Sequence, residues 1–208
     1  MPEKFKRGFS LLALFWALGM FLLGPASLPS PSISVNQEKE LPRGEIVDKV
    51  VCKADSSQTY ALFLPSNYTA EKKWPIMYAF DPGARGKIPV ALFRGAAQKY
   101  GYIVAGSNNS RNGEPPAEAI KALLVDTGSR FSIDQQRVYT TGFSGGARVA
   151  CTVAQMLKGS VAGVIACSGG FPPGLNPSKS TPFILFGTAG SDDFNFPEMN
   201  NSTDRWTL

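Results

Sequence analysis

Histidine is absent from the 208 residues of this chain. Its imidazole is the side chain that most often moves protons near neutral pH, and it serves as the base in many nucleophilic sites. A catalytic group of serine, histidine and a carboxylate therefore cannot be completed by this chain. A second copy of the same chain cannot supply the missing side chain either.

Cysteine is scarce. Cys52, Cys151 and Cys167 are too few and too widely spaced for a disulfide framework or a metal site, so we expect neither a metal nor a cofactor. Buried small apolar side chains are the simplest interpretation of all three. None of them lies on a tight turn beside a base, which argues against a catalytic thiol.

Long runs of basic residues are also missing. The net charge is +5, and no cluster of lysine and arginine indicates a nucleic-acid partner, so that class is excluded. With 43% hydrophobic residues the chain has a globular composition and is long enough to bury one core. The length favours a single domain.

Residues 1–26 have the pattern of an export signal. Lys4, Lys6 and Arg7 form a charged start, residues 9–23 an apolar core, and residues 24–26 a small-residue cleavage site. We expect an exported protein, periplasmic or secreted. An uncleaved anchor is the alternative, although the apolar core is shorter than the roughly 20 residues that a membrane span needs; this segment would then be the one contact with a membrane.

The remainder divides into a spacer and a domain. Residues 27–44 are rich in serine, proline and charge and are expected to be a flexible spacer, which leaves residues 45–208 as the domain. Residues 45–52 and 59–64 are two strand-like runs joined by small polar residues that suit a hairpin. Further strands are expected at residues 75–80, 102–106, 137–142, 161–167 and 182–187, with helices at residues 88–100, 117–125 and 146–157. This alternation predicts an α/β fold whose sheet is mainly parallel after an N-terminal antiparallel hairpin.

The most informative stretch is Gly142-Phe143-Ser144-Gly145-Gly146, which fits the pattern G-x-S-x-G. A strand is predicted before it and a helix after it. In that context the glycines allow a tight turn that holds the serine hydroxyl above the sheet, so Ser144 is the candidate nucleophile. The backbone amide of Gly145 would then open a helix and face a developing oxyanion.

Three other segments follow predicted strands and are expected at the same end of the sheet. Residues 81–86 are placed to supply a second oxyanion amide from Gly83 or Ala84, but Asp-Pro-Gly is equally a plain turn signal. Residues 187–196 hold the candidate acid, Asp193, with Asp192 as the alternative. Residues 107–113 are better interpreted as a solvated loop than as a substrate-binding one.

Aromatic residues flank two of these segments. Phe171, Phe194 and Phe196 are candidates to line an acyl or aromatic pocket, and packing in the core explains isolated phenylalanines equally well.

The sequence resembles the α/β-hydrolase superfamily in four places: residues 60–65, 133–139, 142–148 and 190–195. The branch to which it is most similar comprises exported esterases such as polyhydroxybutyrate depolymerases, feruloyl esterases and dienelactone-hydrolase-like proteins. The resemblance implies a serine hydrolase of small or polymeric esters, with Ser144 as nucleophile, Asp193 as acid and the Gly145 amide in the oxyanion hole. It also implies a histidine loop, a last strand and a final helix beyond the acid, and these are not found in the 208 residues.

We therefore expect a fragment or a shortened product that is nearly inactive as it stands, with a sheet edge and an apolar face left uncovered. Two alternatives stay open: an exported, non-catalytic binding protein on the same scaffold, and a serine peptidase of the same superfamily. The acyl and alcohol groups of a substrate, and the oligomeric state, do not follow from the sequence.

Overall fold

The computed structural model describes residues 40–157, 159–175 and 183–203. The predicted signal segment and most of the predicted spacer lie outside these residues. The end of the spacer contacts the domain: the Gly44 amide donates to the Leu64 carbonyl over 2.7 Å, and the Arg43 guanidinium donates to the Tyr68 carbonyl, also over 2.7 Å. Residues 40–44 thus belong to the same compact unit as the domain predicted from residue 45 on.

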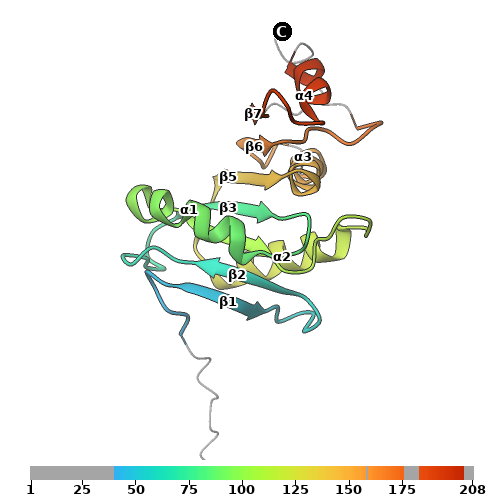
Figure 1. The fold of residues 1–208 in the computed structure, drawn as a ribbon. Helices are drawn as coiled ribbons and strands as arrows, with labels where there is room; N and C mark the ends of the chain where they lie inside the picture. The colour runs from blue at the N-terminus through green and yellow to red at the C-terminus, as the bar shows by residue number, and fades with distance from the viewer. Residues whose placement is uncertain (1–39, 158, 176–182, 204–208) are drawn as a thin grey trace, which may run out of the picture. The chain divides into compact units, whose positions relative to one another are not determined.

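The strands of the described part form one sheet in the order β1-β2-β4-β3-β5-β6-β7 (Figure 1). Their bounds are β1 Ile46–Val51, β2 Thr59–Phe63, β3 Trp74–Phe80, β4 Ile103–Ser107, β5 Ile133–Phe143, β6 Gly163–Cys167 and β7 Ile184–Thr188. The first two strands run antiparallel to their neighbours, and all later pairs are parallel. The predicted architecture, a mainly parallel sheet after an antiparallel hairpin, is confirmed.

The described helices are α1 Lys87–Tyr100, α2 Ala117–Arg130, α3 Gly145–Met156 and α4 Phe196–Thr203. The first three confirm the predicted helices, although α2 continues to Arg130, five residues beyond the expected end. The sequence did not predict α4, and β5 begins at Ile133 rather than Arg137. No helix within the described ranges is both long and apolar enough to cross a membrane.

Alternation along the central strands divides the core between the two faces of the sheet. Tyr78 and Phe80 of β3 belong to the larger cluster, which includes residues of α2 and α3. Ala79, between them, belongs to the smaller cluster with Val90 of α1. Since successive side chains of a strand point to opposite faces, α1 covers one face while α2 and α3 cover the other.

The last strand leaves part of the α1 face bare. β7 lies at the end of the strand order, and its Ile184 and Phe186 are 77% and 60% exposed. Met199 of α4 packs against Gly187 and belongs to the larger cluster, so α4 lies on the other face. The exposed edge and apolar surface predicted from the sequence are therefore present in the part of the chain that the structure describes.

A buried ionic network ties α2 to the antiparallel hairpin. Asp126, which is 2% exposed, accepts hydrogen bonds of 2.7 Å from the Lys53 amide, the Tyr60 hydroxyl and the Arg130 guanidinium. Burial by itself would raise the pKa of the Asp126 carboxyl, but the bonds from Arg130, Lys53 and Tyr60 outweigh it and hold the pKa below its usual value. The network also explains why the helix continues to Arg130 past Gly128.

Replacing Asp126 by alanine should lower the free energy of unfolding by about 3–5 kcal/mol, since Arg130, Tyr60 and the Lys53 amide would lose their buried partner. Because the pKa of Asp126 is lowered in the folded state, its contribution is fully present above the unfolded pKa of about 3.9 and is lost as pH falls through the lower folded pKa. Urea denaturation at neutral pH and at acid pH measures both effects. A difference between wild type and Asp126→Ala that does not shrink at the lower pH would contradict this assignment.

Candidate functional site

The turn between β5 and α3 places Ser144 in a strained conformation. Its backbone has φ 52° and ψ −118°, a region that residues with a side chain rarely adopt. Such a conformation costs on the order of 1–3 kcal/mol and persists only where surrounding contacts fix it. Here the Ser144 amide donates to the Cys167 carbonyl over 2.8 Å, and the Ser144 carbonyl accepts from the amides of Ala147 and Arg148. The side chain is half-buried and so remains accessible.

Glycines on either side of Ser144 allow strand and helix to approach. A Cβ atom on Gly142 would overlap the Gly146 carbonyl oxygen, and one on Gly146 would overlap the carbonyl oxygen of Phe80 at the end of β3. Both neighbours are backbone atoms, which cannot rotate away. The spacing of glycines that identified this motif therefore has the packing reason that the sequence predicted.

The first amide of α3 belongs to Gly145. The leading N–H groups of a helix have no intrahelical acceptor and lie at the positive end of its dipole. An oxyanion formed beside Ser144 would meet this donor. The arrangement suits Gly145 for the role predicted for it.

The other two predicted oxyanion donors are engaged within their own turn. The Gly83 amide donates to Asp81 Oδ1 over 2.8 Å, and the Ala84 amide donates to the Asp81 carbonyl over 3.0 Å. Asp81 is buried and is also held by the Arg85 guanidinium over 2.8 Å. Of the two interpretations of Asp-Pro-Gly, the structure has the turn, and either amide would have to give up an existing bond to receive a substrate oxygen.

The loop after β4 reaches the serine turn, which the sequence-based interpretation as a plain solvated loop missed. The backbone amide of Asn112 donates to the Pro82 carbonyl over 2.9 Å, and the backbone of Arg111 pairs with that of Gly83 in an isolated antiparallel β-bridge. A Cβ atom on Gly145 would lie 2.6 Å from Asn112 Nδ2 and closer still to Oδ1. The one signal in the sequence was the position of this loop at the carboxyl end of a central strand.

Asp193 lies in the loop that follows β7. Its carboxylate accepts hydrogen bonds from the Ser168 hydroxyl and, over 2.8 Å, from the Asn195 amide. The bond from Ser168, which has the larger effect, and the bond from Asn195 hold the pKa of Asp193 below its usual value. The carboxyl group is therefore ionised at neutral pH. Asp192, the alternative acid, is exposed, whereas Asp193 is half-buried.

Two residues that the sequence did not identify connect Asp193 to the serine turn. Asn195 is 4% exposed; its Nδ2 donates to the Ser168 carbonyl over 2.8 Å, and its Oδ1 accepts from Arg148 of α3 over 3.0 Å. Next to Ser168, a Cβ atom on Gly169 would lie 2.5 Å from the Ser144 carbonyl oxygen. The segment after β6 thus lies against Ser144 on one side and is bonded to the Asp193 loop on the other.

The aromatic residues proposed to line a pocket differ in exposure and packing. Phe194, beside Asp193, is 87% exposed, and Phe196 is also exposed. Phe171 stacks on Phe183 at 6.1 Å between ring centroids and packs against the larger core cluster, as the packing interpretation predicted. Phe143, immediately before Ser144, is 55% exposed and was not singled out from the sequence.

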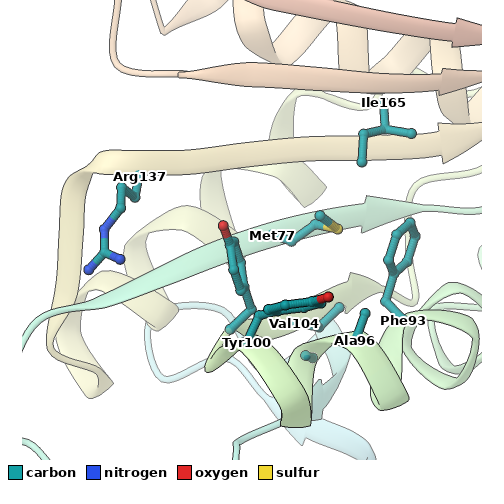
Figure 2. A pocket seen from close by; sticks show the side chains of 9 residues that line it. Met77, Phe93, Ala96, Tyr100, Val104, Arg137 and Ile165 are labelled. Atoms are coloured by element: carbon teal, nitrogen blue, oxygen red, sulfur yellow. The ribbon is translucent and has the colours of Figure 1, made fainter.

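An apolar cavity of about 500 Å³ lies elsewhere, on the α1 face of the sheet. Figure 2 shows Phe93 and Tyr100 of α1 facing Met77 and Ile165 of the sheet, with Arg137 at the rim. Neither Ser144 nor Asp193 lines this cavity, so it is not the space above the serine. The described residues contain no cluster of histidine, cysteine and carboxylate side chains that would hold a metal.

Comparison with known proteins gives structural neighbours. No family model and no curated protein matches the sequence. The feruloyl esterase module from Clostridium thermocellum, a serine-to-alanine mutant complexed with sinapinate, has a TM-score of 0.60 at 16% identity, over 77% of this chain and 71% of that one. An S-formylglutathione hydrolase from Staphylococcus aureus has a TM-score of 0.59 at 13% identity, over 81% and 86%. A thermostable esterase has a TM-score of 0.55 at 16% identity, over 74% and 48%.

The close contact at the turn can be tested by comparing a glycine-to-alanine substitution there with one at an open position. Gly146→Ala should lower the free energy of unfolding by about 1–3 kcal/mol or more, because its Cβ would overlap the backbone of β3. Gly95→Ala, in the middle of α1 with open space around it, should raise stability by up to about 1 kcal/mol through helix propensity. Urea denaturation of both variants tests this. Equal effects of the two would contradict the close approach of α3 to the sheet.

Proposed function

On the premise that the chain has the α/β-hydrolase fold, which its sequence resembles and its structural neighbours share, we propose that it is a serine hydrolase of carboxylic esters. The observation that carries the proposal is the backbone of Ser144, a non-glycine residue held at φ 52° between a strand and a helix N-terminus. The turn imposes this conformation on whichever residue occupies position 144, and glycine would adopt it at the lowest cost. A serine there gains exposure of its hydroxyl, which a nucleophile needs.

The proposed chemistry follows from the placement of three groups. The oxygen of Ser144 attacks the ester carbonyl carbon, the carbonyl electron pair moves onto oxygen, and the Gly145 amide donates to that oxyanion. The ionised Asp193 is suited to orient an imidazole and to stabilise its cation. Since the sequence contains no histidine, the serine proton has no imidazole acceptor within these 208 residues, and we expect slow turnover by this chain alone.

The substrate class is inferred from the surroundings of the site. Phe143 precedes Ser144 in the chain, Phe194 follows Asp193, and both are exposed, so their rings are available to contact an aromatic or acyl group of a small or polymeric ester. We infer from residues 1–26 that the protein acts after export, in the periplasm or outside the cell, as expected of an esterase similar to polyhydroxybutyrate depolymerases.

A fluorophosphonate should modify the chain at Ser144 and nowhere else. The serine oxygen bonds to phosphorus, fluoride leaves, and the phosphonyl oxygen takes the place of the ester oxyanion. Intact-mass spectrometry over hours, followed by peptide mapping, measures the reaction. Imidazole added to the buffer should accelerate it by acting as the missing proton acceptor. Ser144→Ala is the blank, and a wild-type chain that stays unmodified with imidazole present would overturn the proposal.

Ester hydrolysis by the chain alone should be very weak. Loss of one member of a serine–histidine–acid group costs on the order of 10⁴ to 10⁶ in kcat in serine proteases. We expect the rate of p-nitrophenyl acetate hydrolysis without imidazole to differ little between wild type and Ser144→Ala. Rapid turnover that the substitution abolishes would show that the site needs no imidazole.

The absence of histidine favours one second candidate, an exported binding protein that keeps the hydrolase scaffold without its chemistry. Such a protein has no need for a reactive serine. It predicts that Ser144 reacts with the fluorophosphonate no faster than exposed serines such as Ser66 or Ser191.

A further inference from the structure

Stabilising an oxyanion in acyl transfer commonly takes two hydrogen-bond donors. Of the three backbone amides predicted for this role, the Gly145 amide is the one without a hydrogen-bond acceptor among the described residues. Gly145 supplies that amide at the start of α3. The amides of Gly83 and Ala84 are both bonded to Asp81, within a turn that the Arg85 guanidinium also holds. A second donor from another element would complete the pair without breaking this turn.

The side chain of Asn112 is placed to supply it. A Cβ atom on Gly145 would overlap its Oδ1 and Cγ and would lie 2.6 Å from Nδ2, so the carbonyl end of the amide is nearest. A half-turn about the Cβ–Cγ bond brings Nδ2 to the position of Oδ1 and presents its N–H groups there. Gly145 is the residue whose N–H is the first donor. The backbone of Asn112 is fixed in turn by its bond to the Pro82 carbonyl.

The neighbouring asparagines show what is unusual about Asn112. Asn108 uses both ends of its amide, accepting from Gly86 and donating to the Asp48 carbonyl. Asn109 likewise accepts from Thr59 and donates to the Ser57 carbonyl. These four bonds anchor the loop. The side-chain amide of Asn112, by contrast, makes no hydrogen bond to any described residue, and Asn112 is exposed.

We propose that the Asn112 side-chain amide donates the second hydrogen bond to the oxyanion formed at Ser144. This inference rests on the proposed function. As Ser144 Oγ bonds to the carbonyl carbon and its proton passes to a base, the electron pair that moves onto the carbonyl oxygen meets two donors, the Gly145 N–H and Asn112 Nδ2. An asparagine amide carries two N–H donors, so one suffices for this role.

The need for glycine at position 145 follows from the same arrangement. Gly145 has an ordinary helical start and no positive φ, so its backbone tolerates a side chain. The space that a methyl group would need is occupied by the Asn112 amide. Gly145→Ala keeps the backbone N–H but pushes Asn112 away from the turn.

The test uses the rate of fluorophosphonate modification of Ser144 in the full chain, with imidazole present, measured by intact-mass spectrometry. Asn112→Ala should slow the reaction by about 10²-fold, at the low end of the range for losing one oxyanion donor because the side chain is exposed. Asn112→Asp should be slower still, since a carboxylate repels the oxyanion. A purely structural role for this exposed side chain predicts no difference between the two variants.

Asn67→Ala is the matched control, because Asn67 is an exposed asparagine in the turn between β2 and β3, beside the start of β3, and should leave the rate unchanged. Gly145→Ala should slow the reaction as much as Asn112→Ala, and the double variant should be no slower than either. Urea midpoints of all variants separate these effects from unfolding.

The outcomes distinguish the two proposals. Modification of the wild-type chain together with slow Asn112→Ala and slower Asn112→Asp supports the inference. Modification at the same rate in wild type and Asn112→Ala overturns the role of Asn112 and leaves the nucleophile standing. Failure of Ser144 to react in the wild-type chain overturns both.

Discussion

The structure depends on the close contact of β5 and α3 around Ser144. Two glycines let the backbones touch, and the chain can turn from strand to helix in that space only through the unusual conformation of the residue between them. The cost of that conformation is offset by bonds that reach across the sheet, above all from the Ser144 amide to the end of β6. These bonds fix the backbone of Ser144 between β6 and the first turn of α3, and so fix the place from which the hydroxyl projects.

The loops at this end of the sheet are organised by short polar side chains rather than by apolar packing. Asp81 closes the loop after β3, Asn108 and Asn109 anchor the loop after β4, and Asn195 joins the loop after β7 to Ser168. Bonds of this kind fix donors and acceptors before any substrate arrives, which is the condition for effective electrostatic stabilisation. These bonds also occupy backbone N–H groups. Because Asp81 accepts from the backbone amides of Gly83 and Ala84, neither amide is free to bind a substrate oxygen.

Local patterns predicted the fold and part of the site. The order of strands and helices and the serine turn follow from periodicity and glycine spacing within a few residues, and both were predictable. The first residues of β5, Ile-Asp-Gln-Gln, are mostly polar and gave no strand signal. α4 has a start signal, Asn195 followed by Pro197 and Glu198, but its eight residues are mostly polar and too few to show an apolar period. Asp192 and Asp193 are indistinguishable to any local rule, because what separates them is a hydroxyl 25 residues earlier in the chain, on Ser168. Asn112 was missed for the same reason: its partner, Gly145, is distant in sequence and close only across the sheet.

The environment of Asp193 bears on what the missing imidazole would have to do. Its charge is held by the Ser168 hydroxyl and the Asn195 backbone amide, and the side chain of Asn195 in turn accepts a hydrogen bond from Arg148. A carboxylate satisfied by neutral donors keeps its full negative charge and can still attract a cation, whereas one paired with arginine would be partly neutralised. The loop therefore preserves the electrostatic property that a histidine-orienting acid needs, and does so through residues of this chain alone. On the proposed function, the nucleophile, the oxyanion donors and the charged acid are in place within these residues, and the proton acceptor is the part that must come from elsewhere.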